Sequence, residues 1–188
     1  MIETDRLHLL PFQDSDVEAA FGWFGDPEVM RFVPSGPDMS LEATRKRVLD
    51  YRQHQVAHGF SKWVVRLRGS ADPIGDSGLL VLEETSAIDL GFRLARPHWG
   101  RGFATEAAAA WVRVAFEDLG IETLTAFTHP SNVASVGVLR KVGFSPAGGR
   151  RVMGMDALTF AYQRSERRLP WARGAAEQEH EADRAQGD

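Results

Sequence analysis

The stretch from Leu90 to Glu106 (LGFRLARPHWGRGFATE) constrains the fold of this chain more than any other part of the sequence. An apolar, strand-like segment runs into a short loop with two glycines, and an alanine-rich helical segment begins directly after that loop. Glycine lets the backbone approach a ligand closely, and a new helix offers unpaired N–H groups and the positive end of its dipole. The stretch therefore predicts an anion site suited to a diphosphate, with Arg96 and Arg101 adding positive charge.

Two glycines two residues apart are weak support by themselves, because a tight strand-to-helix turn uses glycine equally well. The dinucleotide-binding pattern needs a third glycine, which the GRGFAT sequence lacks, and the acid that follows, Glu122, opens the next strand. A phosphate loop of the Walker type is excluded, because no Gly-Lys-Ser or Gly-Lys-Thr occurs in the chain.

Helical and strand signals alternate along the rest of the sequence and predict a mixed α/β sheet. Ser40 is expected to cap one helix, and Gly120 to end another. The expected strands are about 7–10, 61–68, 73–84, 86–94, 122–129 and 151–163, and the expected helices about 14–24, 40–59, 103–119 and 131–142.

The length and composition predict one globular domain over residues 1–168 and an acidic, disordered tail over 169–188. The absence of cysteine excludes disulfides and thiolate metal sites, and no metal is expected. A net charge of −4 without a basic patch argues against nucleic-acid binding. No apolar run approaches the ~18 residues of a membrane span, and no leader sequence is evident, so a cytoplasmic protein is expected, either a monomer or a homodimer.

Four ordered segments together resemble the GNAT superfamily of acyl-CoA N-acyltransferases, and in particular its RimJ/RimL branch. The segment WGRGFATEA looks like the acetyl-CoA pyrophosphate loop of that superfamily. The other three are ETDRLHLLPFQDSDVEAAF, DPEVMRFVP and HPSNVASVGVLRKVGF, and the resemblance covers about residues 2–164. It implies a twisted mixed sheet of about 6–7 strands flanked by helices, with acetyl-CoA as co-substrate and a primary amine as acceptor.

The same resemblance implies where acetyl-CoA binds. In the family the coenzyme lies where two parallel strands splay apart, which here are the strands at 86–94 and 122–128. Asn132 matches an asparagine that binds the pantetheine, although it also suits a helix cap. Lys141 either reaches the adenosine phosphates or is a surface lysine. The pantetheine would pair with the backbone of Phe92, Arg93 and Leu94, and the diphosphate would lie on the amides of Arg101, Gly102, Phe103, Ala104 and Thr105.

Two residues are candidates for the chemistry. Asp89 matches a position where this branch often carries glutamate and is the candidate general base, the alternative being a strand acid that faces solvent. Ser135 matches a serine near the coenzyme sulfur and either protonates the thiolate or only orients it. Many relatives have a tyrosine as the acid at the position of Leu139, so the usual donor is missing here.

The acceptor is the least constrained part of the prediction. A protein N-terminal α-amine is the leading candidate; the alternatives are a small amine, such as an antibiotic or polyamine, and an acyl-CoA-binding sensor without turnover. Substrate selection is expected at 21–38, 83–87 and 146–155, with the aromatic residues Phe21, Trp23, Phe24 and Phe32 assigned to core packing or an acceptor pocket. His54 and His58 have zinc-helix spacing but lack the accompanying glutamate and a third ligand, which favours a solvated helix end.

Overall fold

A computed structural model describes residues 1–164 of the chain and contains one sheet of eight strands. The expected tail at 169–188 and the end of the expected domain lie outside the described residues. The strands follow the order β1-β2-β3-β4-β5-β6-β8-β7 across the sheet. Their bounds are β1 Ile2–Glu3, β2 Leu7–Pro11, β3 Lys62–Leu67, β4 Pro73–Val81, β5 Ile88–Leu94, β6 Thr123–Thr128, β7 Ser145–Val152 and β8 Met155–Gln163.

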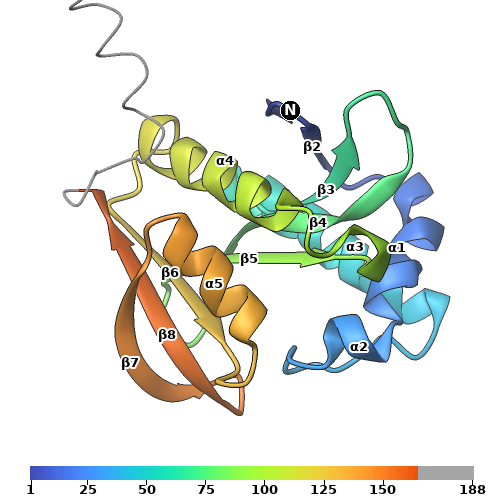
Figure 1. Cartoon of the computed structure of the whole chain (residues 1–188). Coiled ribbons are helices and arrows are strands. Elements are labelled where there is room, and N and C mark those ends of the chain that lie inside the picture. Colours follow the sequence, from blue (N-terminus) through green and yellow to red (C-terminus); the bar gives the residue numbers. More distant parts are fainter. Residues whose placement is uncertain (165–188) are drawn as a thin grey trace, which may run out of the picture.

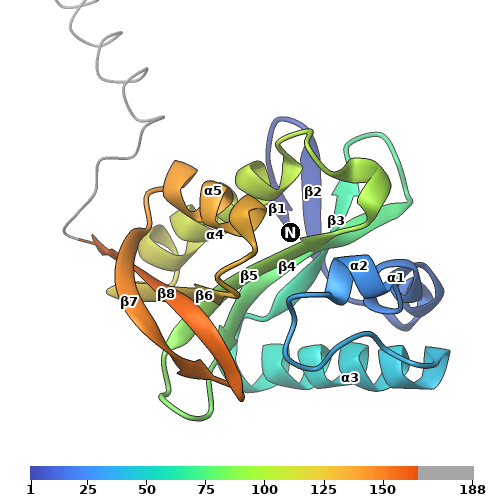
Figure 2. The same cartoon turned by 60° about the horizontal axis from the view of Figure 1, so that its bottom comes forward.

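Helices cover both faces of this sheet (Figures 1 and 2). On one face, α4 packs on β4 and β5 and buries Trp111, Phe116 and four alanines against the strands. On the other face, α1 and α3 enclose a second apolar cluster around Phe12, Trp23 and Phe24. The helices are α1 Val17–Phe24, α2 Pro27–Met30, α3 Leu41–His58, α4 Phe103–Glu117 and α5 Val133–Lys141.

Among the described strands, β5 and β6 form the one parallel pair, and this pairing is short. The two strands pair with each other at Asp89 and Thr125. Beyond this point β5 continues to Leu94 paired with β4, and β6 continues to Thr128 paired with β8, without further pairing between β5 and β6 in the described part of the chain. The strands therefore part toward their carboxyl ends, which confirms the expected mixed sheet with splayed parallel strands.

The strand expected over 151–163 is wrong in its bounds, because the structure has a hairpin of β7 and β8 there. The hairpin turns at Met153 and Gly154, which both adopt positive φ angles, of 48° and 77°. Strand β7 (SPAGGRRV) is exposed except at its last residue, so it shows no apolar alternation in the sequence. With β7 and the two-residue β1, the sheet has eight strands instead of about 6–7.

Local sequence signals place most helix ends correctly. The Ser40 hydroxyl accepts the Ala43 N–H at 3.2 Å and caps α3, as expected. Helix α1 differs from the prediction, because a 3-10 turn at Asp14–Asp16 precedes it. Gln13 caps that turn, and Asp16, not Asp14, stands at the N-cap of α1. None of the helices in the described range 1–164 has the length and hydropathy needed to cross a bilayer.

Candidate functional site

The glycine loop brings the start of α4 to the carboxyl end of β5. Gly102 has a φ of 81°, a left-handed conformation that glycine adopts at little cost, and it directly precedes the helix. The first intrahelical bond joins the Glu106 N–H to the Gly102 carbonyl at 3.1 Å. The amides of Phe103, Ala104 and Thr105 therefore have no intrahelical acceptor and are available to an anion.

A clamp that sequence reasoning missed holds this loop against the first strands. The Arg6 guanidinium donates to Glu106 Oε2 at 2.6 Å and to the Arg101 carbonyl at 3.0 Å. The Thr4 hydroxyl donates to Glu106 Oε1 at 2.6 Å. Although burial opposes it, hydrogen bonds from Thr4 and Arg6 lower the pKa of Glu106, so the clamp stays charged. The clamp joins residues about a hundred positions apart, which no local pattern indicates.

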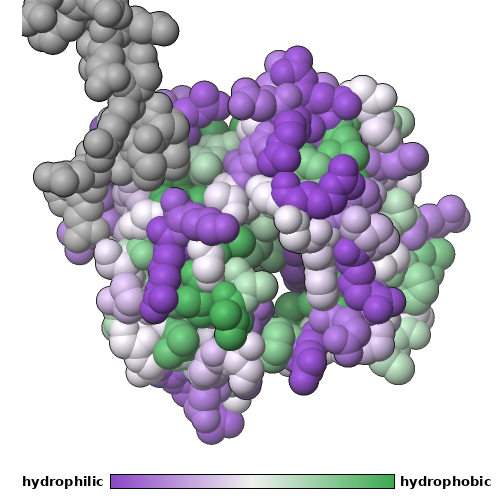
Figure 3. All heavy atoms as spheres, viewed as in Figure 1, coloured by the Kyte–Doolittle hydropathy of each residue, from purple (hydrophilic) through white to green (hydrophobic). Residues whose placement is uncertain are grey.

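A cleft of about 1530 Å³ begins at this loop and follows the gap between β5 and β6. The space-filling view shows the molecule hollowed near its centre, between the α5 side and the α2 side (Figure 3). Of the residues expected to bind acetyl-CoA or act on it, all but Arg96 and Arg101 line the cleft. The Arg96 guanidinium donates to Asp26 at 2.7 Å. The Arg101 guanidinium instead packs over the Phe103 ring, 4.9 Å from its centroid. The lining ones are Asp89, Phe92, Arg93, Leu94, Gly102, Phe103, Ala104, Thr105, Asn132, Ser135 and Lys141.

On the α5 wall of the cleft, Asn132 and Ser135 lie on the same helical turn. The Asn132 side-chain oxygen accepts the Ser135 N–H at 3.2 Å and caps α5. The cap interpretation is thus correct for that oxygen, while the Asn132 amide nitrogen remains a donor on the cleft. Leu139, at the position of the missing tyrosine, is 1% exposed and belongs to the apolar core.

Asp89 is buried, with 7% of its surface exposed, so the alternative of a solvent-facing acid is wrong. Its Oδ1 accepts a hydrogen bond of 3.3 Å from the Thr125 hydroxyl, across the last pair before β5 and β6 separate. Burial raises the pKa of Asp89, and the charge of Lys62, the Thr125 hydrogen bond and Arg150 oppose this rise. A carboxyl group with a raised pKa in a cleft suits general base catalysis near neutral pH.

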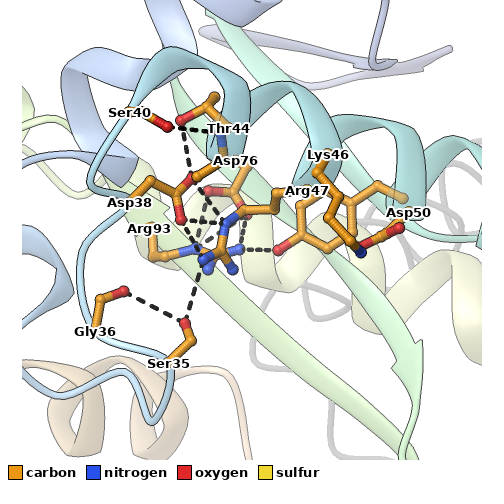
Figure 4. Close-up of polar contacts among 12 residues, drawn as sticks. Ser35, Gly36, Asp38, Ser40, Thr44, Lys46, Arg47, Asp50, Asp76 and Arg93 are labelled. Atoms are coloured by element: carbon orange, nitrogen blue, oxygen red, sulfur yellow. Dashed lines mark hydrogen bonds and ion pairs between the residues drawn. The ribbon is translucent and has the colours of Figure 1, made fainter.

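Beside Asp89, the side chain of Arg93 points away from the β5–β6 gap into a buried ion-pair network (Figure 4). Its guanidinium donates to Asp76 at 2.6 and 3.0 Å and to the Tyr51 hydroxyl at 2.7 Å. Trp23 Nε1 donates to the same carboxylate at 3.0 Å. Only the backbone of Arg93 is therefore free to meet a coenzyme, while its side chain fixes α1 and α3 to the sheet.

A second arginine in Figure 4 shapes the wall opposite α5. Arg47 donates to Asp38 at 2.6 Å and to the Ser35 hydroxyl at 3.2 Å, and it packs 5.1 Å from the centroid of the Phe24 ring. Asp38 also accepts a 2.8 Å bond from Thr44. These contacts hold the 33–38 segment beside the cleft, where substrate selection is expected.

Of the four aromatic residues considered from the sequence, Trp23 and Phe24 are core residues. Phe32 lines the cleft and stacks on His129, with ring centroids 5.2 Å apart, so that the α2 side touches the loop between β6 and α5. Phe21 is not among the cleft residues.

The two histidines at helical spacing have a structural explanation. His54 Nδ1 lies 2.8 Å from the Phe60 carbonyl, and Nε2 accepts the Val81 N–H at 3.0 Å. Both ring nitrogens of His54 are thus used by the backbone. No cluster of three or more potential metal ligands occurs in the portion of the chain that the structure describes.

Comparisons with known proteins agree with this geometry. The family model described as an acetyltransferase (GNAT) domain matches residues 6–145. The uncharacterized protein YkkB of Bacillus subtilis is 31% identical over 143 residues, covering 74% of this chain and 82% of its own. An acetyltransferase structure from Agrobacterium tumefaciens has a TM-score of 0.76 and 26% identity, and the match covers 87% of this chain and 94% of that one. The aminoglycoside acetyltransferase AAC(6')-Ib, solved with coenzyme A, shares the fold at a TM-score of 0.72 and 17% identity, over 85% and 96% of the two chains.

Proposed function

This chain belongs to the GNAT acetyltransferase family and is an N-acetyltransferase, and we propose that its acceptor is the α-amine of a protein N-terminus. The observation that carries the proposal is the buried carboxyl group of Asp89, which lines the cleft where β5 and β6 part. An acid at this point can take a proton from an amine that meets a thioester held between the two strands.

The described residues fit acetyl-CoA as the co-substrate. A diphosphate is an anion with several acceptor oxygens, and the amides of Phe103, Ala104 and Thr105 supply unpaired donors at the positive end of α4. Beyond Asp89, the edge of β5 that faces β6 offers backbone groups to the pantetheine amides, as in strand addition. Asn132 and Lys141 extend this lining toward the thiol and the adenosine phosphates.

Three residues divide the chemistry in this proposal. Asp89 accepts a proton from the acceptor ammonium, directly or through one water, and leaves a neutral amine. A backbone N–H near Leu94 faces the negative charge that develops on the carbonyl oxygen during acyl transfer. The Ser135 hydroxyl lies on the cleft and orients or protonates the departing sulfur. A thiol with a pKa of about 8.5 leaves with little assistance, so the absence of a tyrosine at Leu139 is tolerable.

The α-amine is favoured because it is easier to deprotonate than a lysine. At pH 7 roughly 10–15% of an α-amine is neutral, against about 0.04% of a lysine side chain. A single buried carboxyl group is therefore a sufficient base for an N-terminus. The cleft volume of about 1530 Å³ also suits a peptide end together with the coenzyme.

A small cationic amine is the second candidate, and one observation favours it. Besides Asp89, four carboxylates line the cleft away from α4: Glu28, Asp50, Glu83 and Glu84. They would attract a polyamine or an antibiotic with several amino groups.

Thiol release from acetyl-CoA tests the proposal with a panel of peptides, N-acetylated peptides, polyamines and aminoglycosides. We expect turnover with free peptide N-termini and none with the blocked peptides. The Asp89→Asn variant is expected to lose about a hundredfold or more in kcat, the scale of general base catalysis, while calorimetry detects unchanged coenzyme A binding. Asp118→Asn, an exposed acid beyond the end of α4, is the matched control.

Turnover with polyamines but not with peptides would identify a small cationic amine, and not a protein N-terminus, as the acceptor. Coenzyme A binding without turnover on any acceptor would identify a sensor. Wild-type kcat in Asp89→Asn would remove Asp89 from the mechanism.

A further inference from the structure

Lys62 is a buried lysine on β3, and its side chain extends across β4 toward β5. Lys62 of β3 pairs with Gly78 of β4, and Gly78 pairs with Gly91 of β5, so the three residues form one row across the strands. Lys62 Nζ donates to the Gly78 carbonyl at 2.7 Å. A Cβ atom on Gly91 would lie 2.4 Å from that nitrogen. A Cβ atom on Gly78 would instead lie 2.1 Å from the Ser61 carbonyl oxygen, so it is Gly91 that clears the path of the Lys62 amine to β5, the strand of Asp89.

Lys62 also lines the cleft, although it is almost completely buried. Its exposed fraction is 6%, yet it is among the residues that line the cleft, together with Asp89 and Gly91. A fully buried ammonium is costly unless an opposite charge lies nearby. A lysine in such a place, whose amine fits only because residue 91 has no side chain, indicates a role at the cleft.

Of the acidic groups that act on Lys62, Asp89 is the one available to balance its charge. The carboxylate of Asp76, on β4, is already occupied by the two nitrogens of Arg93, which comes from β5. His54 faces Lys62 from α3, and both its ring nitrogens are used by backbone groups. Asp89 has a neutral partner, Thr125, and the charge of Arg150 on β7 also acts on it. Among the described residues no ion pair within 4.0 Å involves either Lys62 or Asp89, so the two charged groups lie farther apart than a direct ion pair.

Lys62 and Asp89 each affect the pKa of the other. Burial and the positive charge of Arg93 lower the pKa of Lys62, and Asp89 and Asp76 oppose this. Burial raises the pKa of Asp89, and the charge of Lys62 opposes it. Each charge therefore partly offsets the effect of burial on the other group, although the pKa of Lys62 remains lowered and the pKa of Asp89 remains raised.

We propose that Lys62 is a positioning residue for acyl transfer, which keeps Asp89 as a carboxylate until the acceptor ammonium arrives between the two side chains. A proton then passes from the acceptor nitrogen to an Asp89 oxygen, leaving a neutral amine and a neutral carboxyl group, and it later returns to solvent. Once the acceptor is in place, the ammonium of Lys62 disfavours a second positive charge beside it and so favours transfer of the proton to Asp89. The inference rests on the proposed function of Asp89.

The pH profile of kcat/KM tests this role, because its acidic limb reports the ionisation of the base in the free enzyme. Lys62→Met removes the charge and keeps the length of the side chain. We expect the acidic limb to move up by about one to three pH units, the effect of losing a nearby opposite charge, with activity recovered at higher pH. Gly91→Ala displaces the ammonium without removing it and is expected to move the limb in the same direction by less.

The matched controls are Lys46→Met, an exposed lysine, and Gly22→Ala, whose new Cβ meets nothing within 4 Å. Both should leave the limb in place. An unmoved limb in Lys62→Met overturns the inference. If that variant does not fold, an unmoved limb in Gly91→Ala overturns it instead.

A second measurement separates this inference from the proposed function. Carbon-13 NMR of the aspartate carboxyl groups, with Asp89→Asn for assignment, follows the titration of Asp89 without any substrate. An upward shift of that titration in Lys62→Met supports the pairing even if no acceptor is turned over. An unchanged titration refutes the pairing even if the enzyme is active.

Discussion

Removal of the Asp76 carboxylate is the sharpest test of how the sheet is joined to the helices that line the cleft. Asp76 is fully buried and accepts three hydrogen bonds of 2.6–3.0 Å, two from Arg93 and one from Trp23. In Asp76→Ala the Arg93 guanidinium stays buried without a counter-charge. Breaking one partner of a buried pair costs about 3–5 kcal/mol in the free energy of unfolding.

Urea unfolding followed by tryptophan fluorescence measures this cost, and Trp23 reports directly on the site. For a chain of this size the same loss corresponds to a decrease of roughly 6–20 °C in Tm. Asp50→Ala is the control, because its ion pair with Lys46 is exposed and such pairs contribute only about 0–1 kcal/mol. The double variant Asp76→Ala/Arg93→Met should regain part of the loss, since it removes the unpaired charge. A cost below about 1 kcal/mol for Asp76→Ala would refute the assignment of this network as a structural joint.

Two further predictions concern the coenzyme loop and the pH dependence of stability. Gly102→Ala places a Cβ on a left-handed residue, which costs about 1–2 kcal/mol, and calorimetry should record weaker coenzyme A binding, whereas Gly22→Ala in α1 should bind as wild type. Burial and the nearby charges of His58 and Lys62 lower the pKa of His54 below 6.5, against the opposing hydrogen bond to Phe60. The unfolded chain then binds the proton more tightly, so stability is full above about pH 6.5 and falls as the pH decreases through the folded value. Urea unfolding of His54→Gln, measured from pH 7.5 to 5, should show a smaller decrease in the free energy of unfolding than the wild type. An equal decrease would assign the loss of stability to other groups.

The parts of the fold that local chemistry determines could be predicted from the sequence. The Ser40 cap, the glycine loop at Gly102 and the run of alanines in α4 each depend on neighbours within a few residues. The placement of Asp89 on the cleft followed from a family resemblance together with strand alternation. The exposed strand β7 could not be found in this way, because it has no apolar face.

The parts that depend on register between distant strands could not be predicted. Lys62 becomes important only because Gly78 and Gly91 stand beside it in the sheet, and sequence separation hides that row. The clamp from Arg6 to Glu106 is hidden for the same reason. Burial of Asp89 follows from the layers on both sides of the sheet, which no single strand pattern reports.

The stacked rings of Phe32 and His129 have a kinetic consequence. They join the α2 side to the loop before α5, beside the cleft. A bulky acceptor that enters there has to separate the rings, and an aromatic pair of this kind stabilises the closed arrangement by only about 0.5–1.5 kcal/mol. The contact is therefore weak compared with the binding free energy of a typical substrate, and separating the two rings would add little to the barrier for a bulky acceptor.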